Sequence, residues 1–118
     1  MKRRLAAACC ILVLAACSGT RDPQAEANAV TRAVYNDDVA GVAAHLDSAL
    51  QPQVTRAGVG MISDKMHALG AYTGLTPLAQ DAGKHEYTYQ ANFTKGKMNV
   101  VVRLGTDGTF AAFRVFPL

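Results

Sequence analysis

The fold of this chain is decided by residues 85–104, which read HEYTYQANFTKGKMNVVVRL. Apolar and polar residues alternate on both sides of Lys95-Gly96, with the period of two that is typical of half-buried β-strands. Lys95-Gly96 fits a two-residue hairpin turn. Folding the chain there sets apolar residues opposite apolar ones: Phe93 with Met98, Ala91 with Val100, Tyr89 with Val102 and Tyr87 with Leu104. A slip of one residue would spoil this match, so the pattern predicts an antiparallel hairpin with one buried face.

Two further strands flank this hairpin. A turn at residues 105–108 leads into a last strand over 109–116, and residues 75–81 can form only an edge strand because Pro77 lacks a backbone N–H. The predicted core face consists of Tyr87, Tyr89, Phe93, Met98, Val100, Val102, Leu104, Phe113 and Val115.

The opposite face of the sheet is predicted to carry an interface patch. Its candidate residues are Val101, Arg103, Phe110, Arg114 and Phe116. Two exposed phenylalanines on one strand with arginines nearby are typical of a surface that binds a protein partner or a second copy. The alternative is that the C-terminal tail or the first strand covers these phenylalanines.

Three helices are predicted upstream of the sheet. Asp22-Pro23 supplies an N-cap and a first-turn proline for a helix that ends near Asn36. Asp37-Asp38 can cap a second helix, and Thr55 a third that Gly70 ends as a C′ glycine. Helices followed by an antiparallel meander define an α+β fold. We expect three N-terminal helices packed on one face of a curved antiparallel meander of about four strands.

The beginning of the chain has the features of a secretory signal. Three basic residues follow Met1, and an apolar run of about a dozen residues ends at Ala16, well short of the roughly 20 needed to span a bilayer. Leu14-Ala15-Ala16-Cys17 closely resembles the lipobox of bacterial lipoproteins. The resemblance implies cleavage before Cys17 and acylation of both its thiol and its new amino group.

This motif sets the predicted domain organisation and location. Residues 1–16 form the cleaved signal, residues 17–22 the lipidated cysteine and tether, and residues 23–118 one domain. The partner implied for Cys17 is a membrane, with the domain facing the periplasm. Ser18-Gly19 lacks the Asp that marks inner-membrane retention in enterobacterial lipoproteins, so the outer membrane is expected.

The charge composition limits which kinds of partner are expected for the mature chain. Of the 12 Lys and Arg residues, Lys2, Arg3 and Arg4 lie in the signal, which leaves nine against nine Asp and Glu. These charges are scattered, whereas a nucleic-acid surface needs clustered Lys and Arg, so nucleic acid is not an expected partner. Cys9 and Cys10 leave with the signal, and the domain then has no disulfide and must rely on burial.

The order of elements resembles the nuclear-transport-factor-2-like superfamily, a cone-shaped fold of the cystatin-like type. The resemblance rests on the sequence NDDV at 36–39, on Leu69-Gly70, and on VVVRLGTDGTFAAF at 100–113, and it covers roughly residues 24 to 117. In particular the chain looks like the short bacterial branch of unknown function. Members with enzymatic activity are usually longer and build a deeper cavity.

The sequence predicts no catalytic set, metal site or cofactor. His45, His67 and His85 lack metal-ligand spacing, and each serine lies outside a nucleophile-elbow motif. Tyr87 and Tyr89 could present hydroxyls to a ligand on the core face. The alternative is that their rings fill the core, because no acid on that face can act as their partner.

These observations support three functional hypotheses. The first is a periplasm-facing, lipid-anchored, non-enzymatic module that binds a protein partner or a small apolar ligand. The second, by analogy only, is an immunity or inhibitor lipoprotein that neutralises an antibacterial toxin. The third is a small hydrolase or isomerase that uses the sheet cavity beside Tyr87 and Tyr89.

Overall fold

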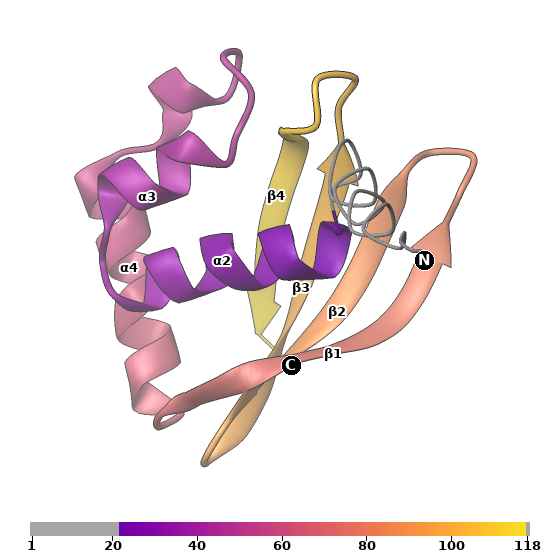
Figure 1. Ribbon diagram of the computed structural model, residues 1–118. Helices are drawn as coiled ribbons and strands as arrows, with labels where there is room; N and C mark the ends of the chain where they lie inside the picture. Colours follow the sequence, from indigo (N-terminus) through magenta and orange to yellow (C-terminus); the bar gives the residue numbers. More distant parts are fainter. Residues whose placement is uncertain (1–21, 118) are drawn as a thin grey trace, which may run out of the picture.

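The computed structural model describes residues 22–117, so the predicted signal, the predicted lipidation site Cys17 and all of the predicted tether but Asp22 lie outside it. Three α-helices pack on one face of a curved, open, four-stranded antiparallel sheet of order β1-β2-β3-β4 (Figure 1). The predicted α+β class and its layering are confirmed. The elements are α2 (Pro23–Tyr35), α3 (Val39–Ala44), the 3-10 helix η2 (Gln51–Gln53), α4 (Arg56–Ala68), β1 (Tyr72–Asp81), β2 (Glu86–Phe93), β3 (Gly96–Leu104) and β4 (Phe110–Pro117).

Short polar side chains start all three α-helices. Asp22 accepts a hydrogen bond from the Gln24 amide at 3.0 Å, and Asp38 and Thr55 each accept one at 3.0 Å from the amide three residues later. These bonds satisfy backbone donors that have no partner within the helix. Gly70 follows α4 with φ +99°, the left-handed region that favours glycine. The predicted helix starts and the glycine stop are therefore confirmed.

The β2–β3 hairpin has the predicted faces but a different register. Phe93 pairs with Gly96 and Tyr89 with Val100, a shift of two residues from the predicted pairing that leaves Thr94 and Lys95 in the turn. The segment after α4 explains the shift, because the Lys95 amide donates to the Leu69 carbonyl at 2.7 Å. A Cβ on Gly96 would lie 2.7 Å from Leu69 Cδ2, so this glycine permits close approach and is not part of the turn.

β1 is an edge strand, as Pro77 predicts, and it begins earlier than expected, at Tyr72. Its pairing with β2 is interrupted twice, between Tyr72 and Gly74 and between Pro77 and Ala79. The residue skipped at the second irregularity is Leu78, whose side chain is 50% exposed. The edge is therefore bent and irregular.

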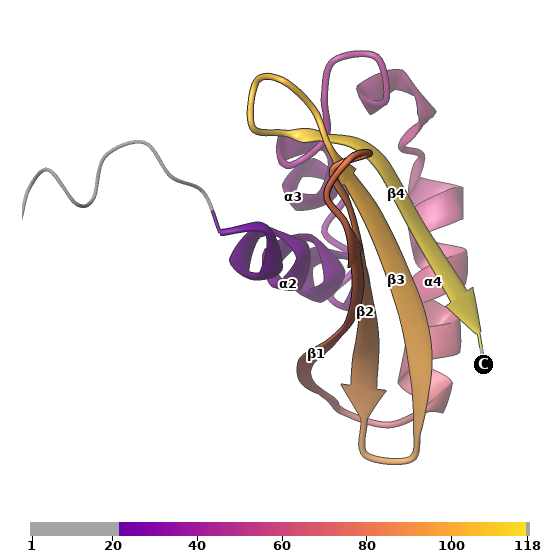
Figure 2. The same cartoon turned by 90° about the vertical axis from the view of Figure 1, so that its right-hand side faces the viewer.

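The core lies between the helices and the inner face of the sheet. Its buried apolar residues come from α2, α3, α4 and all four strands, and they include Val30, Val34, Met66, Tyr72, Tyr89, Phe93, Met98, Val100 and Val102. Tyr87, Leu104, Phe113 and Val115 are half-buried and pack against this cluster. None of the helices within residues 22–117 covers the outer face of the sheet (Figure 2).

The prediction that Phe110 lies on the outer face is wrong. Leu104 pairs with Phe110 but Arg103 pairs with Ala112, so β4 has one extra residue, Ala111, at this point. Such a bulge reverses the alternation, and it turns the Phe110 side chain into the core with 1% exposure. The segment before η2 holds this arrangement, because the Phe110 amide donates to the His45 carbonyl at 3.0 Å and the Phe110 carbonyl accepts from the Asp47 amide at 2.9 Å.

Candidate functional site

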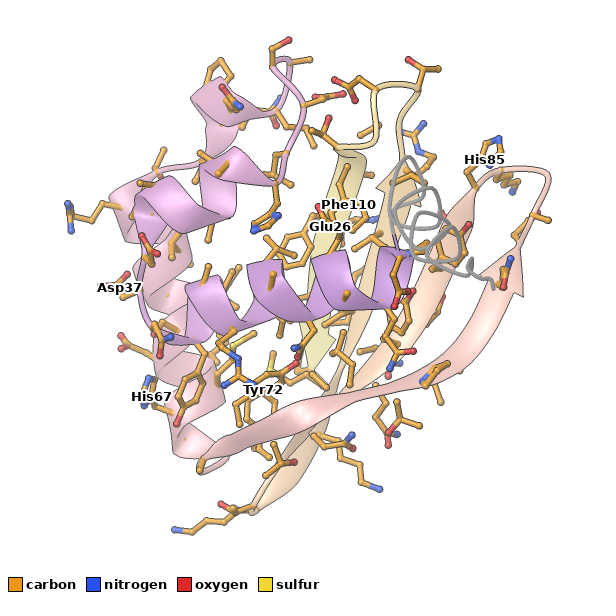
Figure 3. All side chains as sticks on the ribbon, in the orientation of Figure 1. Glu26, Asp37, His67, Tyr72, His85 and Phe110 are labelled. Carbon is orange, nitrogen blue, oxygen red and sulfur yellow. The ribbon has the colours of Figure 1, made fainter. Side chains whose placement is uncertain are left out.

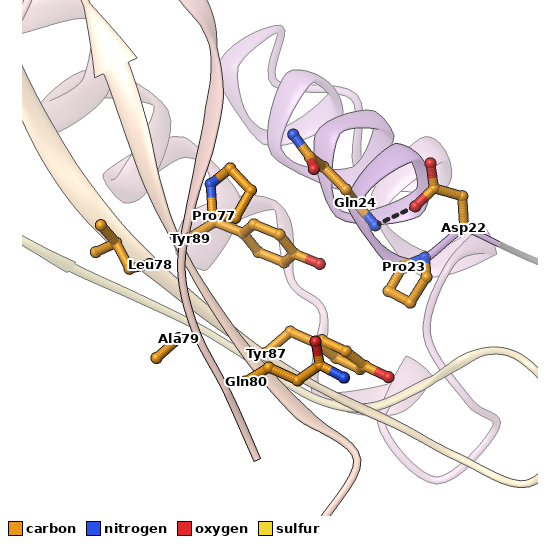
Figure 4. Close-up of a pocket in the computed structure, with 9 residues that line it drawn as sticks. All are labelled: Asp22, Pro23, Gln24, Pro77, Leu78, Ala79, Gln80, Tyr87 and Tyr89. Carbon is orange, nitrogen blue, oxygen red and sulfur yellow. Dashed lines mark hydrogen bonds between the residues drawn. The ribbon is translucent and has the colours of Figure 1, made fainter. Parts of the chain in front are cut away.

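A cleft of about 400 Å³ lies between the start of α2 and the β1–β2 edge of the sheet. Figure 4 shows the lining residues on both sides of it. They are Asp22, Pro23, Gln24, Pro77, Leu78, Ala79, Gln80, Tyr87 and Tyr89. The volume is at the lower end of the range for small-molecule pockets.

The two tyrosines that the sequence singled out line this cleft together. They are two residues apart on β2, so both project from the same face of the sheet toward α2 (Figure 4). Tyr89 is 4% exposed, and Tyr87 is half-buried. Within residues 22–117, no hydrogen-bond partner of either hydroxyl is found. Both phenols are therefore available to a ligand in the cleft.

Burial, with smaller contributions from the negative charge of Asp22 and from the neighbouring Tyr87, raises the pKa of the Tyr89 hydroxyl to about 12. The sign of the shift means that the neutral phenol is favoured over the phenolate. Near neutral pH, Tyr89 is a hydrogen-bond donor and acceptor and carries no charge.

Asp22 contributes the only charged side chain among the lining residues that belong to the described part of the chain. Its Oδ1 accepts from the Gln24 amide as the N-cap of α2. The Gln24 side chain in turn donates from Nε2 to the Leu75 carbonyl at 3.4 Å, which joins α2 to β1. Sequence reasoning missed this carboxylate as a neighbour of Tyr89, because it comes from a helix start far away along the chain.

A second, more apolar pocket of about 230 Å³ lies between the helices and β4. Its walls come from α2, α3, α4 and the connection around η2, and Phe113 reaches it from β4. The lining residues are Val34, Val42, Leu46, Leu50, Gln53, Val54, Thr55, Gly58, Val59, Ile62 and Phe113. An apolar lining of this size suits a small apolar molecule.

Four of the five predicted interface residues do lie on the outer face of the sheet. Arg103 and Arg114 are exposed, Val101 is half-buried opposite Arg114, and Phe116 is 44% exposed. The Arg114 guanidinium lies 5.8 Å from the centre of the Phe116 ring and 3.8 Å from Glu86 Oε2. The patch therefore exists without Phe110.

His67 and His85 lie on opposite sides of the molecule (Figure 3). His45 Nδ1 lies 3.3 Å from Glu26 Oε1, His67 stacks on Tyr35 with ring centres 4.0 Å apart, and His85 is exposed in the β1–β2 turn. In the described part of the chain, no three His, Cys, Asp or Glu side chains come close enough to hold a metal ion.

No helix in residues 22–117 combines the length and apolar character needed to cross a bilayer. No protein family, curated protein or solved structure matches this chain. The candidate site therefore stands on its geometry alone.

Proposed function

We propose that this protein is a lipid-anchored, non-enzymatic binding module that faces the periplasm and holds a small ligand in the cleft between α2 and the β1–β2 edge. The observation that carries this proposal is the pair of hydroxyls on Tyr87 and Tyr89, which face one cleft without a protein hydrogen-bond partner in residues 22–117. A few convergent polar groups in a partly apolar cleft are typical of ligand sites.

The protonation of Tyr89 favours binding over catalysis. A general base works best with a pKa near the working pH, whereas the pKa of Tyr89 is about 12. Asp22 is exposed and already accepts a bond from the Gln24 amide. The hydrolase or isomerase hypothesis would therefore have to rely on the exposed Asp22 carboxylate as its only acid or base among the described lining residues.

The anchor rests on the lipobox-like sequence that ends at Cys17. Metabolic labelling with a fatty acid, followed by intact-mass measurement, tests it directly. We expect label and added mass on the wild type and neither on Cys17→Ser. A Cys17→Ser variant that still fractionates fully with membranes would contradict the lipid anchor.

The cleft is tested by native mass spectrometry of the protein purified from its own membranes in mild detergent. We expect the wild type to retain a small molecule and the Tyr87→Phe/Tyr89→Phe variant to lose it, since the rings stay and only the hydroxyls go. Phe116→Ala is a matched control on the outer face. Equal retention by both variants would exclude the cleft, and conversion of the bound compound to a product would overturn the non-enzymatic assignment.

The outer face of the sheet supports a second candidate function, the binding of a protein partner. Phe116 exposes a large apolar ring beside Arg114, and Oδ1 of the neighbouring Asn99 is buried without a hydrogen bond in the described residues. A second copy or, under the immunity hypothesis, a toxin would cover this patch. We expect Phe116→Ala to weaken co-purification or self-association, and Leu78→Ala, which removes an exposed side chain of β1, to leave it unchanged.

A further inference from the structure

The short tether fixes where the tyrosine cleft can be relative to the membrane. Only five residue-to-residue steps separate Cys17 from Asp22, and a fully extended chain spans at most about 18 Å over them. Asp22 itself lines the cleft. A lipid on Cys17 therefore keeps this wall of the cleft within about 18 Å of the bilayer surface.

The groups around the cleft suit that position. Tyrosines are enriched at membrane interfaces, where the ring contacts apolar groups and the hydroxyl contacts polar ones. Leu78, on the β1 side of the cleft, is 50% exposed and offers an apolar contact next to it. Among the described lining residues none is cationic, so the cleft itself offers no charged partner for a phosphate group.

The negative charge in the cleft favours a positively charged ligand group. Its single charged lining group is the Asp22 carboxylate, which has no ion-pair partner within residues 22–117. Tyr87 and Tyr89 add two aromatic rings on the opposite wall (Figure 4). A carboxylate with aromatic rings is the combination that recognises ammonium groups, through charge and through cation–π attraction. A volume of about 400 Å³ is enough for a head group but not for acyl chains as well.

We propose that the cleft binds the ammonium head group of a phosphatidylethanolamine-type lipid in the leaflet that holds the Cys17 anchor. This inference rests on the anchoring part of the proposed function, and it makes the membrane itself the source of the ligand. The head-group contact turns the β1–β2 edge toward the bilayer. The lipid on Cys17 and the cleft then act as two linked attachments, and the second forms at a high effective concentration of lipid.

The test uses the mature lipidated protein in nanodiscs of phosphatidylglycerol, with or without phosphatidylethanolamine, and measures hydrogen exchange along β1 and β2. We expect slower exchange of these strands only when phosphatidylethanolamine is present. Asp22→Asn should lose this protection, because Asn caps a helix as well as Asp but carries no charge. Asp64→Asn makes the same charge change at an exposed position on α4 and should behave as the wild type.

A second arm separates the head-group chemistry from the anchor. The unlipidated Cys17→Ser protein is titrated with soluble dihexanoyl-phosphatidylethanolamine and with the matching phosphatidylglycerol. We expect the nuclear magnetic resonance signals of Tyr87 and Tyr89 to shift saturably with the phosphatidylethanolamine only. The affinity of Asp22→Asn for this lipid should be about fivefold weaker than that of the wild type. Equal responses to both lipids, or an Asp22→Asn variant that binds like the wild type, would overturn the inference. The intact mass of the mature protein reports separately whether the anchor is present.

Discussion

The substitution Phe110→Ala separates the observed fold from the face assignment that simple alternation predicts. Phe110 is 1% exposed, and its backbone amide and carbonyl are held by His45 and Asp47. The substitution leaves both backbone bonds in place and removes only the ring. It therefore measures the packing of the side chain alone.

The expected loss is large. Removing a buried phenylalanine costs about 3–5 kcal/mol, because transfer free energy is lost and a cavity remains. A domain of this size has a total free energy of unfolding of about 5–15 kcal/mol. The melting temperature should therefore fall by at least about 12 °C. Phe116→Ala is the matched control on the same strand, and at 44% exposure it should cost only about 1 kcal/mol.

The assay is urea unfolding followed by far-ultraviolet circular dichroism, because the chain has no tryptophan to report on the transition. Under the bulged register, the midpoint falls strongly for Phe110→Ala and little for Phe116→Ala. Under unbroken alternation, both phenylalanines lie on the outer face and the two midpoints hardly move. A Phe110→Ala protein as stable as Phe116→Ala would refute the bulge at Ala111.

Three further predictions concern single residues. Gly70→Ala should destabilise the fold by more than Gly74→Ala in urea unfolding, because both glycines have positive φ but only at Gly70 would the new methyl group also collide with a neighbouring side chain. Thr55→Ala should cost about 1 kcal/mol through the lost helix cap, whereas Thr55→Ser should cost little in the same assay. Burial raises the pKa of Tyr72 and of Tyr89 to about 12, so their stabilising contribution is complete below pH 10 and is lost as the pH rises toward 12. An alkaline absorbance titration should find two tyrosines that ionise near pH 12 in the folded protein, and ionisation of all four near pH 10 would contradict this.

Local signals in the sequence predicted the helices well. Each helix start and stop depends on residues within one helical turn, so residues near in sequence are enough to identify them. This holds for the caps at Asp22, Asp38 and Thr55 and for the stop at Gly70. The buried face of β2 could be predicted equally well, because alternation along one strand determines which side chains share a face.

Contacts between distant segments account for the errors. Two hairpin registers that differ by two residues bury the same side chains, so alternation could not choose between them. The choice is made by Leu69, which packs over Gly96 from the end of α4. The prediction of the face on which Phe110 lies was wrong for a similar reason. His45 and Asp47 hold a bulge that no pattern within β4 reveals.

The candidate site was predicted in part. Tyr87 and Tyr89 were placed on one inner face, which the structure confirms, but the cleft needs a second wall. That wall is the start of α2, and its position over β1 depends on how the helix crosses the sheet. The carboxylate of Asp22 therefore could not be paired with Tyr89 from sequence spacing.

The irregular edge of β1 has a consequence for crowding on a surface. Proteins tethered to one membrane meet each other in two dimensions, at local concentrations far above those in solution, and open strand edges then favour end-to-end sheet growth. Pro77 offers no backbone donor, and the kinks beside Gly74 and Leu78 leave no long straight run for a neighbour to pair with. At the other edge, Leu46 already pairs with Phe110. Under the Cys17 anchor that we propose, the β1 edge would therefore be a poor template for sheet growth between neighbouring copies.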